Sequence, residues 1–461
     1  MTRRRFKEAA MHVVTVETPS LGDRSYLVHD GTSALVIDPQ RDVDRIVQEA
    51  DEAGVTITHI AETHVHNDYV SGGLTLARLT GARYVHAAAE PLRFEHDGVG
   101  DGDVFAVGSL QVEVVHTPGH TPNHLSYLVT DPQNAGSPAA FTGGSLLYGT
   151  VGRTDLIAPE ATDELTRAQY RSAHRLADRL PDDAGIYPTH GFGSFCASAQ
   201  SVGDSDGTMG AERSANVALT ATDEDAFVDQ LVAGLDAFPR YYAHMGPMNL
   251  AGGVAVDLSE PTEVDPVELA RRIHRGEWVI DLRPRRDFAA SHVAGTIGVE
   301  LGTSFSTYLA WLLPWGMPIT LLAETKEEIA EAQRQLVRVG IDRPSGAATG
   351  DPAGWIPDAD RSSYRVVDFA TLAAEPELTI LDVRLEGEYK AGHLANATGV
   401  PLHDVLRRLD DIPDGPLAVH CQSGYRASVA ASLLDRAGRD VVLIDDHYDN
   451  ATDSGRPLVD E

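Results

Sequence analysis

Length, composition and charge exclude several classes of protein. The chain has 461 residues, about three times the length of an average domain, so it is not a single small module. Asp and Glu number 69 against 37 Lys and Arg, and the resulting net charge of −32 argues against nucleic-acid and anionic-membrane partners, which both need a cationic surface.

Cysteine usage and the N-terminus bear on location. Cys196 and Cys421 are the only cysteines, too few for a disulfide framework, so we expect a cytoplasmic protein. The basic segment 1–10 has no apolar stretch behind it, which predicts a disordered tail, or a start at Met11, rather than a secretory signal. No apolar run approaches the roughly 18 residues of a membrane span.

Residues 12–257 are expected to form a mixed α/β domain. Two β-runs occupy 12–38, a helix is predicted over 43–54, and strands and helices then alternate. Residues 197–225 are rich in Ser, Gly and Asp without an apolar period, which predicts a loop. The polar, Pro-bearing stretch 258–266 is interpreted as the first linker.

The rest of the chain contains an internal repeat. Residues 279–301 align without a gap with 380–402, at a shift of 101 residues. The matching pairs are Asp281/Asp382, Arg283/Arg384, Phe288/Tyr389, His292/His393 and Gly298/Gly399. So many matches predict one α/β fold used twice, in domains 264–356 and 364–461.

The second repeat contains a cysteine at the end of a strand. A β-run over 417–420 leads into Cys421, and a short loop then opens a helix that ends near Gly438. Backbone N–H groups of such a loop form an anion cradle, and the helix directs its positive end at the sulfur. Arg426 adds a fixed positive charge, and all three features favour the reactive thiolate. The alternative is an inert buried cysteine.

This stretch, PLAVHCQSGYRASVAASLLDRAG, resembles the active loop of rhodaneses, which are sulfurtransferases. The resemblance implies that Cys421 carries a sulfane sulfur as a persulfide and that Arg426 closes the cradle. The residues implied to line the cradle are Gln422, Ser423, Gly424 and Tyr425. A cysteine phosphatase would use C-x5-R, whereas the spacing here is C-x4-R, and the smaller loop suits one sulfur atom better than a phosphate.

The first repeat lacks this apparatus. Aligning Pro318 with Pro416 places Ala323 where the second repeat has Cys421, and no glycine cradle or arginine follows. This module resembles an inactive rhodanese whose role is spacing, docking or dimerisation, and we expect a homo-oligomer.

Histidines follow several strands of the N-terminal domain. His64 and His66 follow one predicted strand, and His120 and His190 follow two others. Imidazoles that converge from strand ends on one edge are how a metal site is built, so the four predict a shared site.

The pattern resembles the metallo-β-lactamase fold, an αββα sandwich with the signature H-x-H-x-D-H. Within that superfamily it is most similar to persulfide dioxygenases, which hold one Fe(II) with two His and one Asp. The resemblance implies His64 and His120 as ligands, with His66 and Asp68 beside the metal. Both GRTDL (152–156) and the fusion to rhodanese modules support it.

Two positions depart from that pattern. Tyr69 replaces the sixth signature residue, and Gly144 replaces the Asp expected in FTGD. These changes argue against a two-metal hydrolase of the glyoxalase II or β-lactamase kind. Three replacements for the missing ligand stay open: His66 as a third ligand, a carboxylate from Asp68 or Asp155, or an external anion. A site of three His would suit Zn better than oxygenase iron.

Two functions follow from these motifs. In the first, the N-terminal domain oxidises a small persulfide to sulfite at one Fe(II) per chain, and Cys421 transfers sulfane sulfur, for instance making thiosulfate. In the second, the chain is a sulfurtransferase only, and Gly144 marks a metal-poor scaffold or binding domain. The expected partners are a small thiol or persulfide and sulfite or thiosulfate, and the rhodanese module needs no cofactor.

Overall fold

The computed structural model describes residues 11–134, 136–198, 207–357 and 360–460, so the predicted N-terminal tail lies outside the described residues. The chain divides into two compact units. The first runs to Val256 and includes the short segment Val337–Gly340, and the second holds the remaining residues. Within the described ranges, no helix has both the length and the apolar character that a membrane crossing needs.

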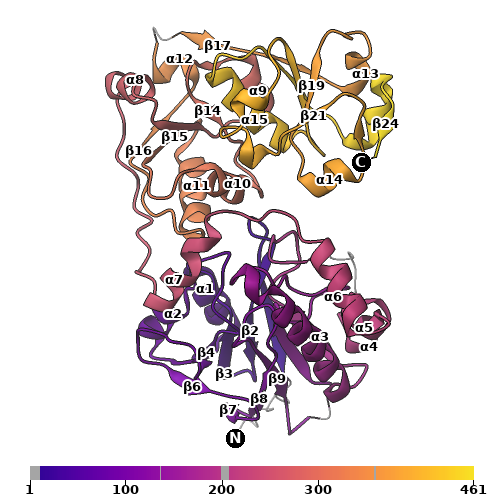
Figure 1. Cartoon of the computed structure of the whole chain (residues 1–461). Coiled ribbons are helices and arrows are strands. Elements are labelled where there is room, and N and C mark those ends of the chain that lie inside the picture. The colour runs from indigo at the N-terminus through magenta and orange to yellow at the C-terminus, as the bar shows by residue number, and fades with distance from the viewer. Residues whose placement is uncertain (1–10, 135, 199–206, 358–359, 461) are drawn as a thin grey trace, which may run out of the picture. The chain divides into compact units, whose positions relative to one another are not determined.

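The first unit contains two β-sheets (Figure 1). The first sheet has six strands in chain order: β1 (His12–Thr18), β2 (Asp23–His29), β3 (Ser33–Ile37), β4 (Thr56–Ala61), β5 (Arg83–Ala87) and β6 (Asp97–Val99). The second has the order β11-β10-β9-β8-β7, with bounds β7 (Val104–Val107), β8 (Leu110–His116), β9 (Leu125–Thr130), β10 (Ala139–Gly143) and β11 (Gly185–Pro188).

The apolar side chains of these strands build layers on both sides of each sheet. Alternate residues of one strand point to opposite faces. Val28 therefore packs between the sheets, with Val114 of the second sheet, while Leu27 packs on the outer face with helix residues such as Ile46. The αββα sandwich predicted from the sequence is thus confirmed, with helices on both outer faces.

The first unit's helices cover those outer faces. Their bounds are α1 (Asp44–Ala53), α2 (Gly73–Thr80), α3 (Thr162–Arg179), α4 (Met209–Ala215), α5 (Val217–Thr220), α6 (Glu224–Ala233) and α7 (Tyr242–Ala251), with a 3-10 turn η1 at Pro159–Ala161. The predicted helix over 43–54 is α1, and Gly54 ends it in the left-handed region (φ 67°), where glycine is favoured.

The loop predicted over 197–225 is wrong in part, because α4 and α5 lie within it; residues 199–206 lie outside the described residues. These helices have only seven and four residues, too short to show an apolar period. Side-chain caps start both: Thr208 accepts the N–H of Ala211, and Asn216 accepts that of Ala218.

The two halves of the second unit share one strand order. The first half has the parallel sheet β14-β12-β15-β16, and the second has β18-β23-β22-β19-β21. The pairs β14/β21, β12/β19, β15/β22 and β16/β23 correspond, and a parallel bridge from Glu263 to Ala347 stands where the second half has β18. In both halves a helix directly precedes the first buried strand, β12 in the first half and β19 in the second.

The bounds of the second unit's strands are β12 (Trp278–Asp281), β13 (His292–Val293), β14 (Ile297–Gly298), β15 (Ile319–Ala323), β16 (Gly346–Thr349), β17 (Arg361–Ser362), β18 (Arg365–Val367), β19 (Thr379–Asp382), β20 (His393–Leu394), β21 (Thr398–Gly399), β22 (Leu417–His420), β23 (Val441–Ile444) and β24 (Leu458–Val459). Its helices are α8 (Pro266–His274), α9 (Arg285–Ala290), α10 (Phe305–Leu312), α11 (Lys326–Arg338), α12 (Pro352–Trp355), α13 (Phe369–Leu372), α14 (Glu386–Lys390) and α15 (Tyr425–Arg436), with 3-10 turns η2 (Leu402–Asp404), η3 (Leu409–Asp411) and η4 (Tyr448–Ser454).

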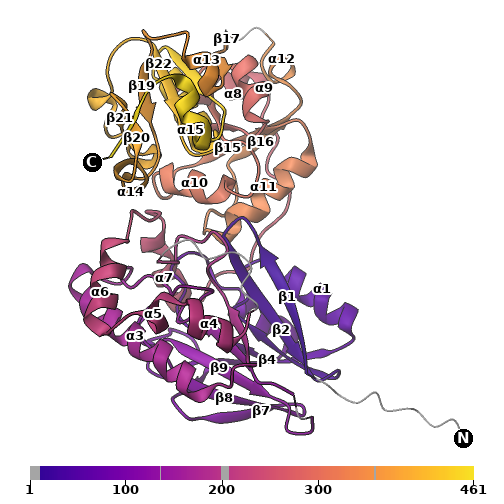
Figure 2. The same cartoon turned by 90° about the vertical axis from the view of Figure 1, so that its right-hand side faces the viewer.

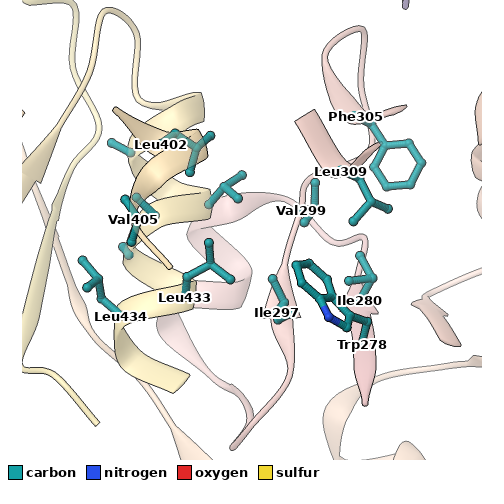
Figure 3. Close-up of a cluster of buried hydrophobic side chains, with 14 of the residues drawn as sticks. Trp278, Ile280, Ile297, Val299, Phe305, Leu309, Leu402, Val405, Leu433 and Leu434 are labelled. Carbon is teal, nitrogen blue, oxygen red and sulfur yellow. The ribbon is translucent and has the colours of Figure 1, made fainter. Parts of the chain in front are cut away.

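The two halves are joined by one apolar core. Trp278, Ile280 and Val299 from the first half belong to the same cluster as Leu402, Val405 and Leu433 from the second, and Leu433 lies opposite Ile297 (Figure 3). Cys421, 1% exposed, belongs to the same core. We defined the domains as 264–356 and 364–461 from the sequence repeat, and this boundary stays a prediction.

Candidate active site and candidate metal centre

Cys421 follows β22, a strand buried between β19 and β23, and precedes α15, which packs along β22 (Figure 2). Gly424 forms the turn into the helix with φ +86°, and a Cβ atom there would lie 2.2 Å from Oδ1 of Asp445. Only glycine fits this turn, so the tight loop after the cysteine depends on Gly424.

The backbone of the loop leaves donors free. Among the residues that the structure describes, the N–H groups of Gln422, Ser423 and Gly424 have no hydrogen-bond acceptor. The carbonyl of Gln422 accepts a hydrogen bond from the N–H of Tyr448 at 2.9 Å, and this bond attaches the loop to η4. This arrangement can bind an anionic group beside Cys421.

Two residues predicted to form the cradle, Tyr425 and Arg426, make side-chain contacts with residues outside the loop. Arg426 forms a two-bond ion pair with Glu388, one contact at 2.8 Å, and this pair links α15 to α14. Burial alone would raise the pKa of Glu388, but Arg426 lowers it below its ordinary value. The Tyr425 hydroxyl donates to the carbonyl of Glu300 in the first half of the unit, at 2.9 Å. Sequence reasoning missed Glu388, which lies 38 residues from Arg426.

The predicted histidines converge in the first unit. β8, β10 and β11 run in the same direction, so the segments after them meet at one sheet edge, and the loop after β4 reaches the same place. His64, His66, His120 and His190 are all buried, and their ring centroids lie 4.1–5.7 Å apart in the pairs that touch. His124, which is not among the predicted site residues, stacks on His64 at 4.9 Å between ring centroids.

Among the predicted site residues, three buried ligand atoms have no hydrogen-bond partner within the described part of the chain: Nδ1 of His66, Oδ1 of Asp68 and Nε2 of His120. Three sets of side chains bring their ligand atoms within 4.8 Å of one another: His64/His120/His190, His66/Asp68/His190 and Asp38/Glu62/His66. Orphaned buried atoms of this kind are what a bound cation would satisfy. The cluster is therefore a candidate metal centre.

The carboxylate expected at position 144 has no place here. A Cβ atom on Gly144 would lie 2.2 Å from Cδ2 of His120, so a side chain cannot be added without moving that ring. Asp155 is held by Arg153 in two hydrogen bonds of 2.7 and 2.8 Å. The iron triad implied by the resemblance, two His and the Asp of FTGD, does not fit this site.

The other two predicted site residues have acidic or imidazole partners. His66 Nε2 lies 3.3 Å from Asp38 and 3.2 Å from Glu62; burial lowers its pKa, but these carboxylates raise it to about 9. Asp68 lies 3.2 Å from Nδ1 of His190. Asp23 lies 2.8 Å from the same nitrogen, and burial raises the pKa of this carboxyl to about 8.

Sequence reasoning missed the carboxylates that surround the cluster. Asp23 begins β2, Asp38 follows β3, and Glu62 follows β4. The sequence signal that could have identified them is an acidic residue directly beside a buried strand. Cys196 is fully buried, and burial raises the pKa of its thiol.

Family models of known proteins match the two chain segments that contain the candidate sites. The Metallo-beta-lactamase superfamily model matches residues 23–190, and the Rhodanese-like domain model matches residues 366–453. A hydroxyacylglutathione hydrolase of Cereibacter sphaeroides is 33% identical over 187 residues, which cover 39% of this chain and 67% of that protein. The chain belongs to the metallo-beta-lactamase superfamily. It also carries a rhodanese-like domain.

Other relatives of this metallo-beta-lactamase superfamily member carry different names. A hydroxyacylglutathione hydrolase of Maricaulis maris is 36% identical over 178 residues, 37% of this chain and 64% of that protein, so the match spans a little under two thirds of its length. The human protein named persulfide dioxygenase ETHE1 is 28% identical over 250 residues, 53% of this chain and 81% of that protein.

A crystal structure of a metallo-beta-lactamase from Staphylococcus aureus extends the comparison. It superposes with a TM-score of 0.66 and 28% identity, covering 74% of this chain and all of that chain. Because the first unit ends at Val256, this coverage reaches into the second unit. The pairing of a domain similar to these proteins with a rhodanese-like domain indicates an enzyme of sulfur or thiol metabolism.

Proposed function

We propose that this protein is a sulfurtransferase that carries sulfane sulfur as a persulfide on Cys421. The observation that carries the proposal is the loop after β22, where three N–H groups without a hydrogen-bond acceptor among the described residues directly follow Cys421. The rhodanese-like match, residues 366–453, includes the whole loop and supports the same chemistry.

The transfer consists of two displacements that balance. The Cys421 thiolate attacks the outer sulfur of a small persulfide, the donor's S–S bond breaks, and the donor leaves as a thiolate with the bonding electron pair. Sulfite then attacks the outer sulfur held on Cys421 and leaves as thiosulfate, while Cys421 returns to the thiolate. No external oxidant or reductant is consumed. The loop N–H groups stabilise the anionic persulfide between the two steps.

The first half of the second unit serves as a frame in this proposal. Ala323 ends β15, the strand that corresponds to β22, so this half has no sulfur carrier. It supplies instead the carbonyl of Glu300, which accepts the Tyr425 hydroxyl at 2.9 Å. We infer that this half is an inactive rhodanese-like module that supports the loop of the active one.

Replacement of Cys421 tests the proposal. Cys421→Ser is expected to abolish transfer of sulfur from a persulfide or thiosulfate to sulfite or a thiol. Cys196→Ser is the matched control, because it removes the other cysteine, which lies in the first unit, and it is expected to leave transfer intact. Wild-type turnover by Cys421→Ser would contradict the assignment.

As a second candidate, we propose that the first unit oxidises a small persulfide to sulfite. The similarity to the human protein named persulfide dioxygenase and the buried His cluster favour it. Gly144, which leaves no room for the expected carboxylate, favours the alternative of a metal-poor scaffold or binding domain.

Oxygen uptake separates these two alternatives. Protein reconstituted with iron under anaerobic conditions is given a small persulfide, and O2 and sulfite are measured together. Uptake that matches sulfite supports oxidation. Absence of uptake by protein that still transfers sulfur through Cys421 supports the sulfurtransferase with a metal-poor N-terminal unit.

A further inference from the structure

The carboxylate of Asp445 lies against the turn that follows Cys421. Asp445 directly follows β23, and its side chain is only 5% exposed. Its Oδ1 is the atom that a Cβ on Gly424 would meet at 2.2 Å, so the carboxylate touches the backbone of the cysteine loop. A negative charge at this place opposes the thiolate of Cys421 and any anionic persulfide formed on it.

Two arginines of the first half of the second unit balance that charge. At the start of α9, Nε of Arg285 donates to Oδ1 of Asp445 at 2.7 Å, and Nε of Arg286 donates to Oδ2 at 2.5 Å. Within the described part of the chain, Asp445 pairs with no other cation. Both carboxylate oxygens therefore accept charge-assisted hydrogen bonds, which are stronger than bonds between neutral groups.

Arg285 is also fixed from its other side. Its Nη1 donates to Oε2 of Glu300 at 2.6 Å, and the backbone carbonyl of Glu300 accepts from the hydroxyl of Tyr425 at 2.9 Å. Tyr425 directly follows Gly424 and begins α15. Arg285 is therefore connected to two neighbouring residues at the helix end of the loop, to one through Asp445 and to the other through Glu300.

The two halves differ in complementary ways at these positions. At the shift of 101 residues, the two arginines align with Glu386 and Gly387, so the second half has no such pair. Gly350 directly follows β16, the strand that corresponds to β23, whereas Asp445 stands at that place in the second half. The contact can thus form only between unlike halves, with the cations on the inactive one and the anion beside the cysteine loop.

We propose that Arg285 and Arg286 are positioning residues for sulfur transfer at Cys421. They neutralise Asp445 and hold it against Gly424, so the loop N–H groups stabilise the anionic persulfide without an opposing charge. This inference rests on the proposed function, because it assigns the electrostatic support of the same cysteine. The alternative is an ion pair that joins the two halves and has no effect on the sulfur.

The rate at which Cys421 takes up sulfur tests the proposal. Full-length protein is mixed with thiosulfate, quenched at intervals and digested, and the added sulfur on the peptide that contains Cys421 is measured by mass spectrometry. Arg285→Gln/Arg286→Gln should slow uptake about 10-fold or more, because an unpaired carboxylate then lies against the loop. Arg285→Lys/Arg286→Lys keeps both charges and should lose far less of the rate.

Removal of the carboxylate separates the two alternatives. Adding Asp445→Asn to Arg285→Gln/Arg286→Gln removes the unpaired charge and should restore most of the lost rate. A merely structural ion pair predicts no such rescue, because Asp445→Asn does not rebuild the contact. Arg286→Gln alone changes a side chain that is 69% exposed. If the double arginine variant does not fold, this single variant is compared with and without Asp445→Asn.

A second arginine pair of the same half provides the matched control. Arg271 and Arg275 are 66% and 52% exposed, and both pair with Glu268 on α8. Arg271→Gln/Arg275→Gln changes the net charge by the same amount and should leave the uptake rate unchanged. Circular dichroism shows whether each variant folds.

Two results would overturn the inference. One is wild-type uptake by folded Arg285→Gln/Arg286→Gln, and the other is a slow rate that Asp445→Asn does not raise. Wild-type protein that places no sulfur on Cys421 would instead overturn the proposed function, and this inference with it. Normal uptake in the arginine variant together with loss of uptake in Cys421→Ser would overturn this inference alone.

Discussion

The two halves of the second unit keep the same frame and differ at the strand end that matters for chemistry. In each half an Asp-x-Arg pair closes at 2.6 Å, and the arginine also donates to a carbonyl eight residues further on. An aromatic ring stacks on the following histidine, at 3.9 Å for Phe288/His292 and 3.8 Å for Tyr389/His393. The halves diverge at Ala323 and Cys421. The shared residues thus maintain the fold, and the loop after Cys421 carries the proposed chemistry.

Moving the cysteine gives the largest expected effect. Cys421→Ser should reduce sulfur transfer to background, and adding Ala323→Cys to that variant should not restore it. The reason is that β15 leads directly through Glu324 and Thr325 into α11, without a glycine turn that frees N–H groups. Transfer to cyanide or sulfite measures both effects. Restored turnover in the double variant would show that a thiol alone suffices at this strand end.

Breaking the shared ion pair should affect both halves alike. Asp281 and Asp382 are fully buried, and removing either leaves an unpaired buried arginine, at a cost of about 3–5 kcal/mol. Asp281→Ala and Asp382→Ala are therefore expected to lower the free energy of unfolding by similar amounts, measured by denaturant titration. If only one variant is destabilised, the two frames are not equivalent.

The turn after Cys421 should be more sensitive than a similar turn elsewhere. Gly424→Ala adds a Cβ atom 2.2 Å from Asp445 at φ +86°, whereas Gly438, with φ +78°, has no atom within 4 Å of that position. Gly438→Ala should cost about 1 kcal/mol from backbone strain alone. Gly424→Ala should cost about 1–3 kcal/mol more, from the clash, and should also lower transfer activity. Equal effects on stability and activity would contradict the role given to this loop.

The smallest expected effect is a pH dependence that the first half lacks. The folded pKa of Glu388 is lowered by Arg426, so the pair stabilises the fold fully above the ordinary value of 4.5. That contribution is lost as the pH falls through the lower folded pKa. Glu388→Gln should remove it, a change of about 1 kcal/mol or less. The free energy of unfolding of the wild type and of Glu388→Gln, measured from neutral to acid pH, checks this prediction. Identical pH profiles of the two proteins would refute it.

Local sequence signals predicted part of this structure well. The helix over Asp44–Ala53 with its Gly54 cap, the gap-free repeat and the strand before Cys421 all depend on residues close together in the chain. The Glu388–Arg426 pair and the carboxylates around the histidines depend on separate strands and helices meeting, which spacing does not reveal. The replacement at Gly144 was visible in the sequence, but the position of His190 opposite His64 was not.

The measurement that tests the central claim most directly is the mass of the protein after exposure to a persulfide donor. Wild-type protein is incubated with thiosulfate or a small persulfide, freed of donor, and analysed intact and after digestion. We predict the added mass of one sulfur atom on the peptide that contains Cys421, and its loss when sulfite is supplied. Sulfur found only on Cys196, or on no cysteine while transfer continues, would contradict the account.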